Sequence, residues 1–165
     1  MDEQIFEETR HEAEELMKQH RLQEAVPLIR QLAHWGDLRS QKELARLLLE
    51  GEPGYPANPH EAFEYVRLAA LNGDAPSQLQ LGRMFLEGLG TDKDLAKAFY
   101  FLDKAAQAGE KEAYDPLSLR YLMGQGVTRN LEKAAYWNAK AAEAFPEDED
   151  VARHGAMIEN YGKRN

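Results

Sequence analysis

The sequence predicts an all-α fold: an α/α solenoid, or superhelix, of about four helix–turn–helix repeats followed by a C-terminal capping helix. Alanine, aromatic and glycine residues return at intervals of 36 or 37 positions, the signature of a repeat architecture. Between the glycines, apolar residues follow the spacing of one helix face. With 165 residues, the chain is long enough to bury a core of its own.

The repeat is clearest at small and aromatic positions. One slot always holds alanine, at Ala25, Ala62, Ala98 and Ala134. The slot three residues later holds a large apolar side chain, at Leu28, Tyr65, Phe101 and Trp137. Small residues let neighbouring helices approach closely, and large residues fill the space beside them. We therefore expect one domain over 1–165, with repeats at about 5–36, 40–73, 76–109 and 112–145 and a cap at 148–161.

Each repeat is expected to contain two helices. In the third repeat, the first helix covers Ser77–Glu87 and ends at Gly88, since glycine readily leaves the helical conformation. The second helix begins after Asp94, and its apolar stripe runs from Leu95 to Ala106. Aspartate and asparagine accept hydrogen bonds from the first free N–H groups of a helix. The equivalent positions in the second and fourth repeats are Asn58 and Asn130.

Two repeats depart from this pattern. The second has a longer, proline-rich loop at Gly51–Pro59, after which Asn58 and Glu61 predict a capping box. The fourth has Pro116 inside its expected first helix, which predicts a kink or a late start because proline lacks an N–H.

Two segments make the pattern specific: LGRMFLEGLGTDKDLAKAFYFLDKAAQAG (81–109) and LSLRYLMGQGVTRNLEKAAYWNAKAAEA (117–144). They resemble the Sel-one-like repeat (SLR), a relative of the tetratricopeptide repeat. Ala45 and Ser118 stand where the family has glycine, and the first repeat reads like a plain tetratricopeptide hairpin. The resemblance covers about residues 5–161. It implies assembly and signalling roles in bacteria and eukaryotes rather than a shared reaction.

The charge balance excludes some partners. The chain carries 29 acidic and 20 basic side chains, a formal charge of −9, and residues 1–20 and 143–165 hold most of the excess. Nucleic acids and anionic membranes bind basic surfaces, so we expect neither as a partner. The start of the chain lacks an apolar signal core, and no stretch is apolar for long enough to span a membrane. We expect a soluble, cytoplasmic protein.

Nothing in the sequence predicts catalysis. Cysteine is absent, and the five histidines have no partners at metal-ligand spacing. Two His-Glu pairs, at 11–12 and 60–61, begin like a zinc-protease helix, but glutamate replaces the second histidine in both. The three serines lie in no nucleophile elbow. We expect no catalytic residue, no metal and no cofactor, and we do not expect an enzyme.

Stacked hairpins place their first helices along a concave groove suited to an extended peptide or to a partner's helix. The residues expected to line it are Lys42, Arg46, Leu49, Arg83, Leu86, Leu119, Leu122 and Met123. Arg46 and Arg83 share one slot, and a guanidinium there suits a carboxylate or backbone carbonyls of a partner. Alternatively, each arginine pairs with a glutamate one turn later on its own helix, Glu50 or Glu87.

These observations favour a non-catalytic protein–protein interaction module, an adaptor or regulator that binds a protein or peptide and is itself a monomer or weak homodimer. Two other hypotheses stay open: a sensor that binds a small ligand in the groove or at the loop Gly51–Pro59, and a hydrolase. Trp137 is expected in the core. Trp35 either anchors a partner or packs against the second repeat.

Overall fold

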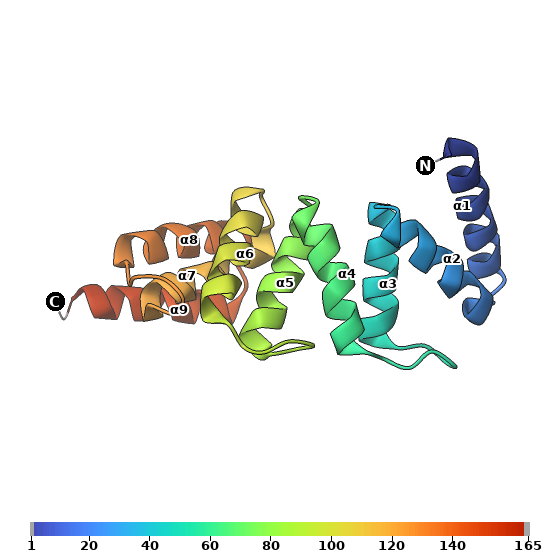
Figure 1. The fold of residues 1–165 in the computed structure, drawn as a ribbon. Helices are drawn as coiled ribbons and strands as arrows, with labels where there is room; N and C mark the ends of the chain where they lie inside the picture. The colour runs from blue at the N-terminus through green and yellow to red at the C-terminus, as the bar shows by residue number, and fades with distance from the viewer. Residues whose placement is uncertain (1, 164–165) are drawn as a thin grey trace. The chain divides into compact units, whose positions relative to one another are not determined.

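A computed structural model describes residues 2–163, and within that range the chain is all-α, with no β-strand (Figure 1). The helices are α1 (Glu3–Lys18), α2 (Leu22–His34), α3 (Leu38–Glu50), α4 (Pro59–Leu71), α5 (Ala75–Glu87), α6 (Leu95–Gln107), α7 (Tyr114–Met123), α8 (Leu131–Ala144) and α9 (Glu149–Gly162). Consecutive helices form hairpins: α1 packs on α2, α3 on α4, and α7 on α8. The predicted all-α solenoid is confirmed.

The chain divides into two compact units. The N-terminal unit comprises Met1–Ser77 with Leu89–Thr91, and the C-terminal unit comprises Gln78–Gly88 with Asp92–Asn165. The N-terminal unit holds the helices α1 to α4, and the C-terminal unit holds most of α5 and all of α6 to α9.

The repeated slots form the cores of both units. The alanine slot is fully buried in every repeat, at Ala25, Ala62, Ala98 and Ala134. Leucines on the first helices are also fully buried, at Leu44, Leu81 and Leu117. Leu95, expected in the apolar stripe of α6, is instead 42% exposed. It lies on the side of its helix that faces away from the core.

Helix starts follow the predicted caps. The side-chain oxygen of Asn58 accepts a hydrogen bond from the Glu61 N–H at 3.2 Å, and those of Asp94 and Asn130 act in the same way on α6 and α8. The predicted capping box is incomplete. The Asn58 N–H donates to the Leu48 carbonyl, and the Glu61 carboxylate turns toward Arg30 on α2.

Pro116 delays the first helix of the fourth repeat. A 3-10 turn at Lys111–Ala113 comes first, and α7 then has 10 residues where α3 and α5 have 13. Pro116 is the third residue of α7, in the turn whose N–H groups have no partner within the helix. The predicted late start is therefore confirmed, and the missing N–H costs no helical hydrogen bond.

Two loop glycines hold successive repeats together. Gly90 and Gly126 have positive φ angles of 71° and 77°. A β-carbon on Gly90 would lie 2.0 Å from the carbonyl oxygen of Pro59, and one on Gly126 would lie 1.9 Å from that of Leu95. Each loop therefore rests directly on the backbone at the start of the preceding second helix, where no side chain fits.

We expect Gly126→Ala to lower the free energy of unfolding by at least about 2 kcal/mol, because it combines an unfavourable positive φ with a backbone clash. Urea unfolding followed by circular dichroism measures the change. Gly162→Ala is the control: Gly162 lies in α9 and no atom lies within 4 Å of its β-carbon position, so the change should not lower stability. Equal stability of the two variants would contradict the role given to the loop glycine.

Arg30 joins α2 to α4 and to the loop between α3 and α4. Its guanidinium donates to the hydroxyl of Tyr65 at 3.0 Å and to that of Tyr55 at 2.9 Å, and it pairs with Glu61. Glu52 and Tyr55 also exchange two backbone hydrogen bonds of 2.8 Å. The proline-rich loop is thus fixed to the helices behind it, and the Tyr55 hydroxyl is used inside the molecule.

Replacing Arg30 with methionine keeps the apolar stem but leaves one carboxylate and two hydroxyls without their donor. We expect Arg30→Met to lower the free energy of unfolding by about 1–3 kcal/mol. Among the residues that the structure describes, Arg67 pairs only with Glu64, three residues earlier on the same helix. Arg67→Met should therefore change the free energy of unfolding by less than about 0.5 kcal/mol. Thermal unfolding of both variants checks this, and a larger loss in the Arg67 variant would refute it.

The last helix, α9, is held by polar contacts. The Asn138 side chain donates to the Val151 carbonyl at 2.9 Å. A β-carbon on Gly155 would lie 2.7 Å from the Asn138 side-chain oxygen, so α8 and α9 touch at this point. His154 Nδ1 lies 2.9 Å from both carboxylate oxygens of Asp115 on α7. These contacts fix α9 at the position predicted for the cap.

Candidate functional site

A cavity of about 280 Å³ opens between α1 and α3 in the N-terminal unit. Its floor is apolar and consists of Ala13, Ile29 and Leu32, each less than 5% exposed. Met17 forms part of the wall. The polar lining comes from charged side chains of α1 and α3, together with Ser40 and the α3 cap Asp37. An apolar floor with polar edges is typical of sites that bind one side chain or a small ligand.

Two ion pairs bridge α1 and α3 beside this cavity. Arg10 Nη2 lies 3.1 Å from Asp37 Oδ1, and Arg39 pairs with Glu14. The Arg10 guanidinium also stacks on Phe6, and its Nε is buried without a hydrogen-bond partner in the described part of the chain. The side chain of Arg39 is 76% exposed. The Arg39–Glu14 pair at the mouth of the cavity is therefore open to solvent.

A shallow hollow continues from the cavity along α3. It is lined by Leu38, Arg39, Lys42, Glu43 and Arg46, and it shares Arg39 and Glu43 with the cavity. We call the cavity and this hollow together the α1/α3 groove. Two residues predicted to bind a partner, Lys42 and Arg46, thus line a concave surface of the N-terminal unit.

Arg46 is surrounded by carboxylates. Its guanidinium lies 2.8 Å from Glu43 and 2.6 Å from Glu50, and Glu52 follows at 3.7 Å. The hydrogen bond with Glu43 is the main reason that the pKa of Arg46 is raised. Arg46 therefore forms the pair with Glu50 that the sequence offered as an alternative, together with two further carboxylates.

Lys42 connects the groove to the start of α5. Its ammonium donates to Asp74 Oδ1 at 2.9 Å, and Asp74 Oδ2 accepts from both the hydroxyl and the N–H of Ser77. Burial opposes ionisation of Asp74, but these hydrogen bonds outweigh it and lower the pKa of the carboxyl. The ionised form of Asp74 is thus preferred in the folded state.

A carboxyl with a lowered folded-state pKa stabilises a protein above its unfolded pKa, about 3.9 for aspartate, and loses this effect as the pH falls through the folded value. We expect Asp74→Asn to cost about 1 kcal/mol at neutral pH, and the difference from wild type to shrink below about pH 4. Urea midpoints across this pH range test this. Asp92→Asn, at an exposed position, serves as the control and should follow wild type throughout.

The other predicted residues lie in different surroundings. Leu49 in the N-terminal unit is partly buried. In the C-terminal unit, Arg83 forms no ion pair with Glu87 or with any other described residue. Leu86 and Leu119 are partly buried against the hydrophobic core, and Met123 is 49% exposed.

The prediction for Leu122 is wrong. Its side chain is fully buried in the hydrophobic cluster that also contains Ile158 of α9. Because α9 packs against α7, it contributes to the core at this end, and Leu122 is not available to a partner.

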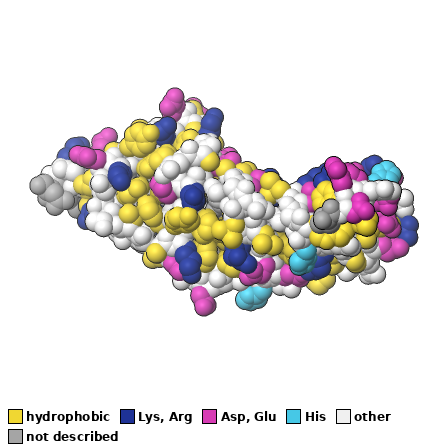
Figure 2. All heavy atoms as spheres, turned by 45° about the horizontal axis from the view of Figure 1, so that its top comes forward, with side chains coloured by type: hydrophobic (Ala, Val, Ile, Leu, Met, Phe, Trp, Pro, Cys, Tyr) yellow, Lys and Arg dark blue, Asp and Glu magenta, His cyan; other side chains and the backbone are white. Residues whose placement is uncertain are grey.

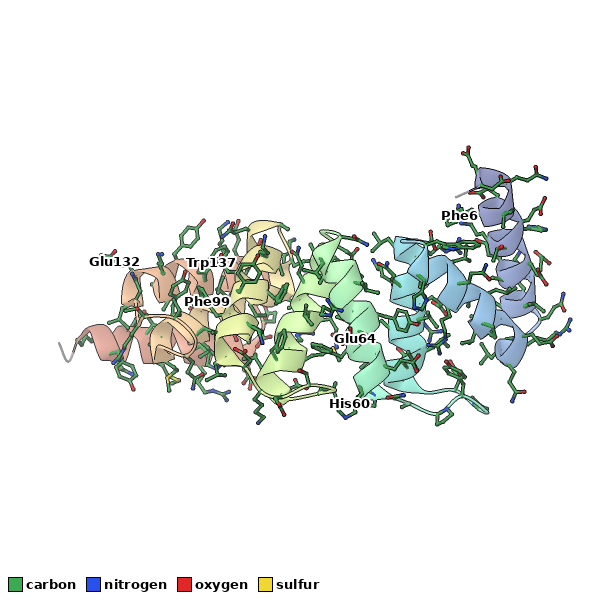
Figure 3. All side chains as sticks on the ribbon, in the orientation of Figure 1. Phe6, His60, Glu64, Phe99, Glu132 and Trp137 are labelled. Atoms are coloured by element: carbon green, nitrogen blue, oxygen red, sulfur yellow. The ribbon has the colours of Figure 1, made fainter. Side chains whose placement is uncertain are left out.

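Sequence reasoning missed the cavity itself. Arg10, Glu14 and Met17 belong to the first hairpin, which lacks the glycine pattern of the later repeats. Their helical spacing beside buried Ala13 was the only available signal. Trp35 packs on Phe6, which Figure 3 labels on α1, with ring centroids 6.0 Å apart. This contact lies within the first hairpin rather than with the second repeat.

The described residues form neither a metal site nor a membrane-spanning helix. Among residues 2–163, no three His, Asp or Glu side chains come together as a metal site. Within the same range, no helix is both long enough and apolar enough to cross a bilayer.

Helical hairpins with small buried residues at their crossings and a grooved first-helix face define a tetratricopeptide-like repeat scaffold. The Sel1 repeat matches residues 38–74, 75–110 and 116–144. The chain therefore belongs to the Sel1 repeat family, whose members are generally protein–protein interaction modules and typically non-enzymatic scaffolds. The α1–α2 hairpin precedes the matched segments.

Solved structures agree with this assignment. A Sel1 repeat protein from Oxalobacter formigenes is 32% identical, with a TM-score of 0.66 over 78% of this chain and 95% of that one. The protective antigen c5321 of uropathogenic Escherichia coli, described as having an SLR fold, is 24% identical, with a TM-score of 0.57 over 83% of this chain and 37% of its own. Helicobacter pylori cysteine rich protein B is 20% identical, with a TM-score of 0.56 over 80% and 92%. The last two show the fold alone. A search of curated proteins gave no match.

Proposed function

We propose that this protein is a non-catalytic adaptor or regulator that binds a segment of a partner protein in the α1/α3 groove. The observation that carries the proposal is the apolar-floored cavity between α1 and α3. Its volume of about 280 Å³ has room for one large apolar side chain. Membership of the Sel1 repeat family supports a protein as the ligand.

The charged side chains at the rim of the α1/α3 groove orient the segment that binds. Arg39 and Lys42 lie side by side on α3 with their side chains 76% and 45% exposed. Each is paired with one carboxylate of this chain, and each pair is at least partly open to solvent. A partner carboxylate flanking the apolar anchor replaces Glu14 as the partner of Arg39, so the charge pattern selects the segment that binds.

The C-terminal unit offers a contact region of its own. Arg83 has its guanidinium uncommitted to any described carboxylate, and Met123 is exposed. Leu86, Leu119 and, in the N-terminal unit, Leu49 present partly buried apolar surface. We place the protein in the cytoplasm, and the absence of cysteine agrees with this location. We expect it to be a monomer or a weak homodimer.

Exchanging the two charges across the groove tests the proposal without removing an ion pair. We expect the double variant Glu14→Arg with Arg39→Glu to keep its helicity and to lose at least about tenfold in recovery of the wild-type partner, because opposite charges then face the bound segment. The measurement is affinity purification from native cells with quantitative mass spectrometry. The control exchanges Glu64 and Arg67 on α4, which are paired at 2.7 Å outside the groove.

If both exchanged variants recover the same proteins as wild type, the α1/α3 groove is not the binding site. The variant Arg46→Glu with Arg83→Glu then tests whether the partner binds the other two predicted arginines. A thermal-shift screen with metabolites and nucleotides addresses small-ligand sensing. Stabilisation by one compound that Met17→Trp abolishes would replace the protein partner by a small ligand.

A further inference from the structure

Two rows of aromatic and lysine side chains repeat on the second helices of the C-terminal unit. Tyr100, Phe101 and Lys104 on α6 recur 36 residues later on α8 as Tyr136, Trp137 and Lys140. The tyrosines are 52% and 55% exposed, among the most accessible large apolar residues of the chain. The second helix α4 of the N-terminal unit has Glu64 and Leu68 in place of the tyrosine and the lysine.

The lysines lie over the rings. Lys104 Nζ is 5.2 Å from the Tyr100 centroid, and Lys140 Nζ is 5.5 Å from Tyr136 and 5.7 Å from Tyr114. Trp137, labelled in Figure 3, packs on Tyr114 at 5.5 Å. Tyr114 begins α7, which packs against both α6 and α8. We call Tyr100, Lys104, Tyr136, Lys140 and the edge of Trp137 the aromatic–lysine face.

These lysines differ from the cations of the N-terminal unit. Every lysine and arginine described in the N-terminal unit forms an ion pair with a carboxylate. Lys104 and Lys140 form no ion pair with a described carboxylate. Asp103, which is next to Lys104 in the sequence, accepts a hydrogen bond from Gln107 at 2.5 Å. Burial raises the pKa of the Asp103 carboxyl, and the charges of Lys133 and Lys104 offset this only in part. Figure 2 shows hydrophobic side chains with Lys and Arg among them on the C-terminal part of the molecule.

We propose that the aromatic–lysine face binds an acidic peptide segment that contains aromatic or other large apolar residues. The two ammonium groups, which form no ion pair with a described carboxylate, are complementary to carboxylates of a partner. Tyrosine and tryptophan bury large rigid surfaces at little entropic cost, so they dominate interface energies. The face lies on second helices, and it is separate from the α1/α3 groove.

Single-stranded nucleic acid also stacks on aromatic rings, but it requires several cations along its backbone. The face has two lysines and no arginine, and the chain as a whole carries −9. An acidic peptide needs only a few carboxylates beside its apolar anchors. The observations therefore favour the peptide.

The test uses a fluorescently labelled random copolymer of glutamate and tyrosine, titrated with the full chain at low ionic strength and followed by anisotropy. We expect saturable binding that weakens as salt is added. Lys104→Glu with Lys140→Glu should weaken it at least about tenfold, and Tyr100→Ala with Tyr136→Ala by about five- to tenfold. Polyglutamate without tyrosine should bind more weakly than the copolymer.

The matched control is Lys93→Glu with Lys111→Glu, which changes the net charge equally at two exposed lysines outside the face. It should bind the copolymer within about twofold of wild type. An equal loss of copolymer binding in both lysine variants would show that net charge explains the effect, and it would overturn the proposal. The absence of copolymer binding by the wild-type chain would overturn it as well. Tighter binding of an oligothymidylate that the Lys104 and Lys140 substitutions abolish would assign the face to nucleic acid. Should the tyrosine variant unfold, Tyr100→Phe with Tyr136→Phe keeps the rings and is expected to retain most of the binding.

Discussion

The architecture depends on close backbone approach at positions where only a hydrogen atom or a methyl group fits. The alanine slot is fully buried in all four hairpins, so each second helix lies against its neighbours with no room for a longer side chain. The loop glycines extend this constraint between repeats, because each touches a backbone carbonyl of the preceding helix. The large aromatic side chains then pack around these contacts. The stability of the fold therefore comes from contacts between neighbouring helices and hairpins rather than from one central core.

Local chemistry explains which features the sequence could predict. Caps such as Asp94 and Asn130 act within a few residues of themselves, and the 36-residue interval places equivalent helices without knowledge of the fold. Charge pairing is different, because it depends on which flexible side chains meet. Arg46 attracts three carboxylates while the equivalent Arg83 attracts none in the described chain. The burial of Leu122 was also out of reach, since it depends on a helix from another part of the sequence.

The two units present different surfaces for recognition. The N-terminal unit has fifteen acidic and eight basic side chains, and its described cations are already engaged with its own carboxylates. Its groove combines an apolar floor with charge pairs that the proposed segment would have to exchange. The C-terminal unit keeps Lys104 and Lys140 against aromatic rings, where the proposed acidic peptide would add carboxylates without displacing an ion pair. Exchange of an ion pair favours selectivity, whereas addition of a counter-charge favours rapid, salt-sensitive association.

Asn138 has a consequence for how such arrays end. It occupies the slot that Val66 and Leu102 fill in the two preceding hairpins, and all three side chains are buried. The Asn138 amide donates a hydrogen bond to the backbone of α9. A further hairpin packed against this position would therefore place its apolar surface against a polar side chain. Duplication of an internal hairpin encounters no such mismatch. Lengthening of this protein during evolution, or by design, is therefore easiest in the middle of the chain.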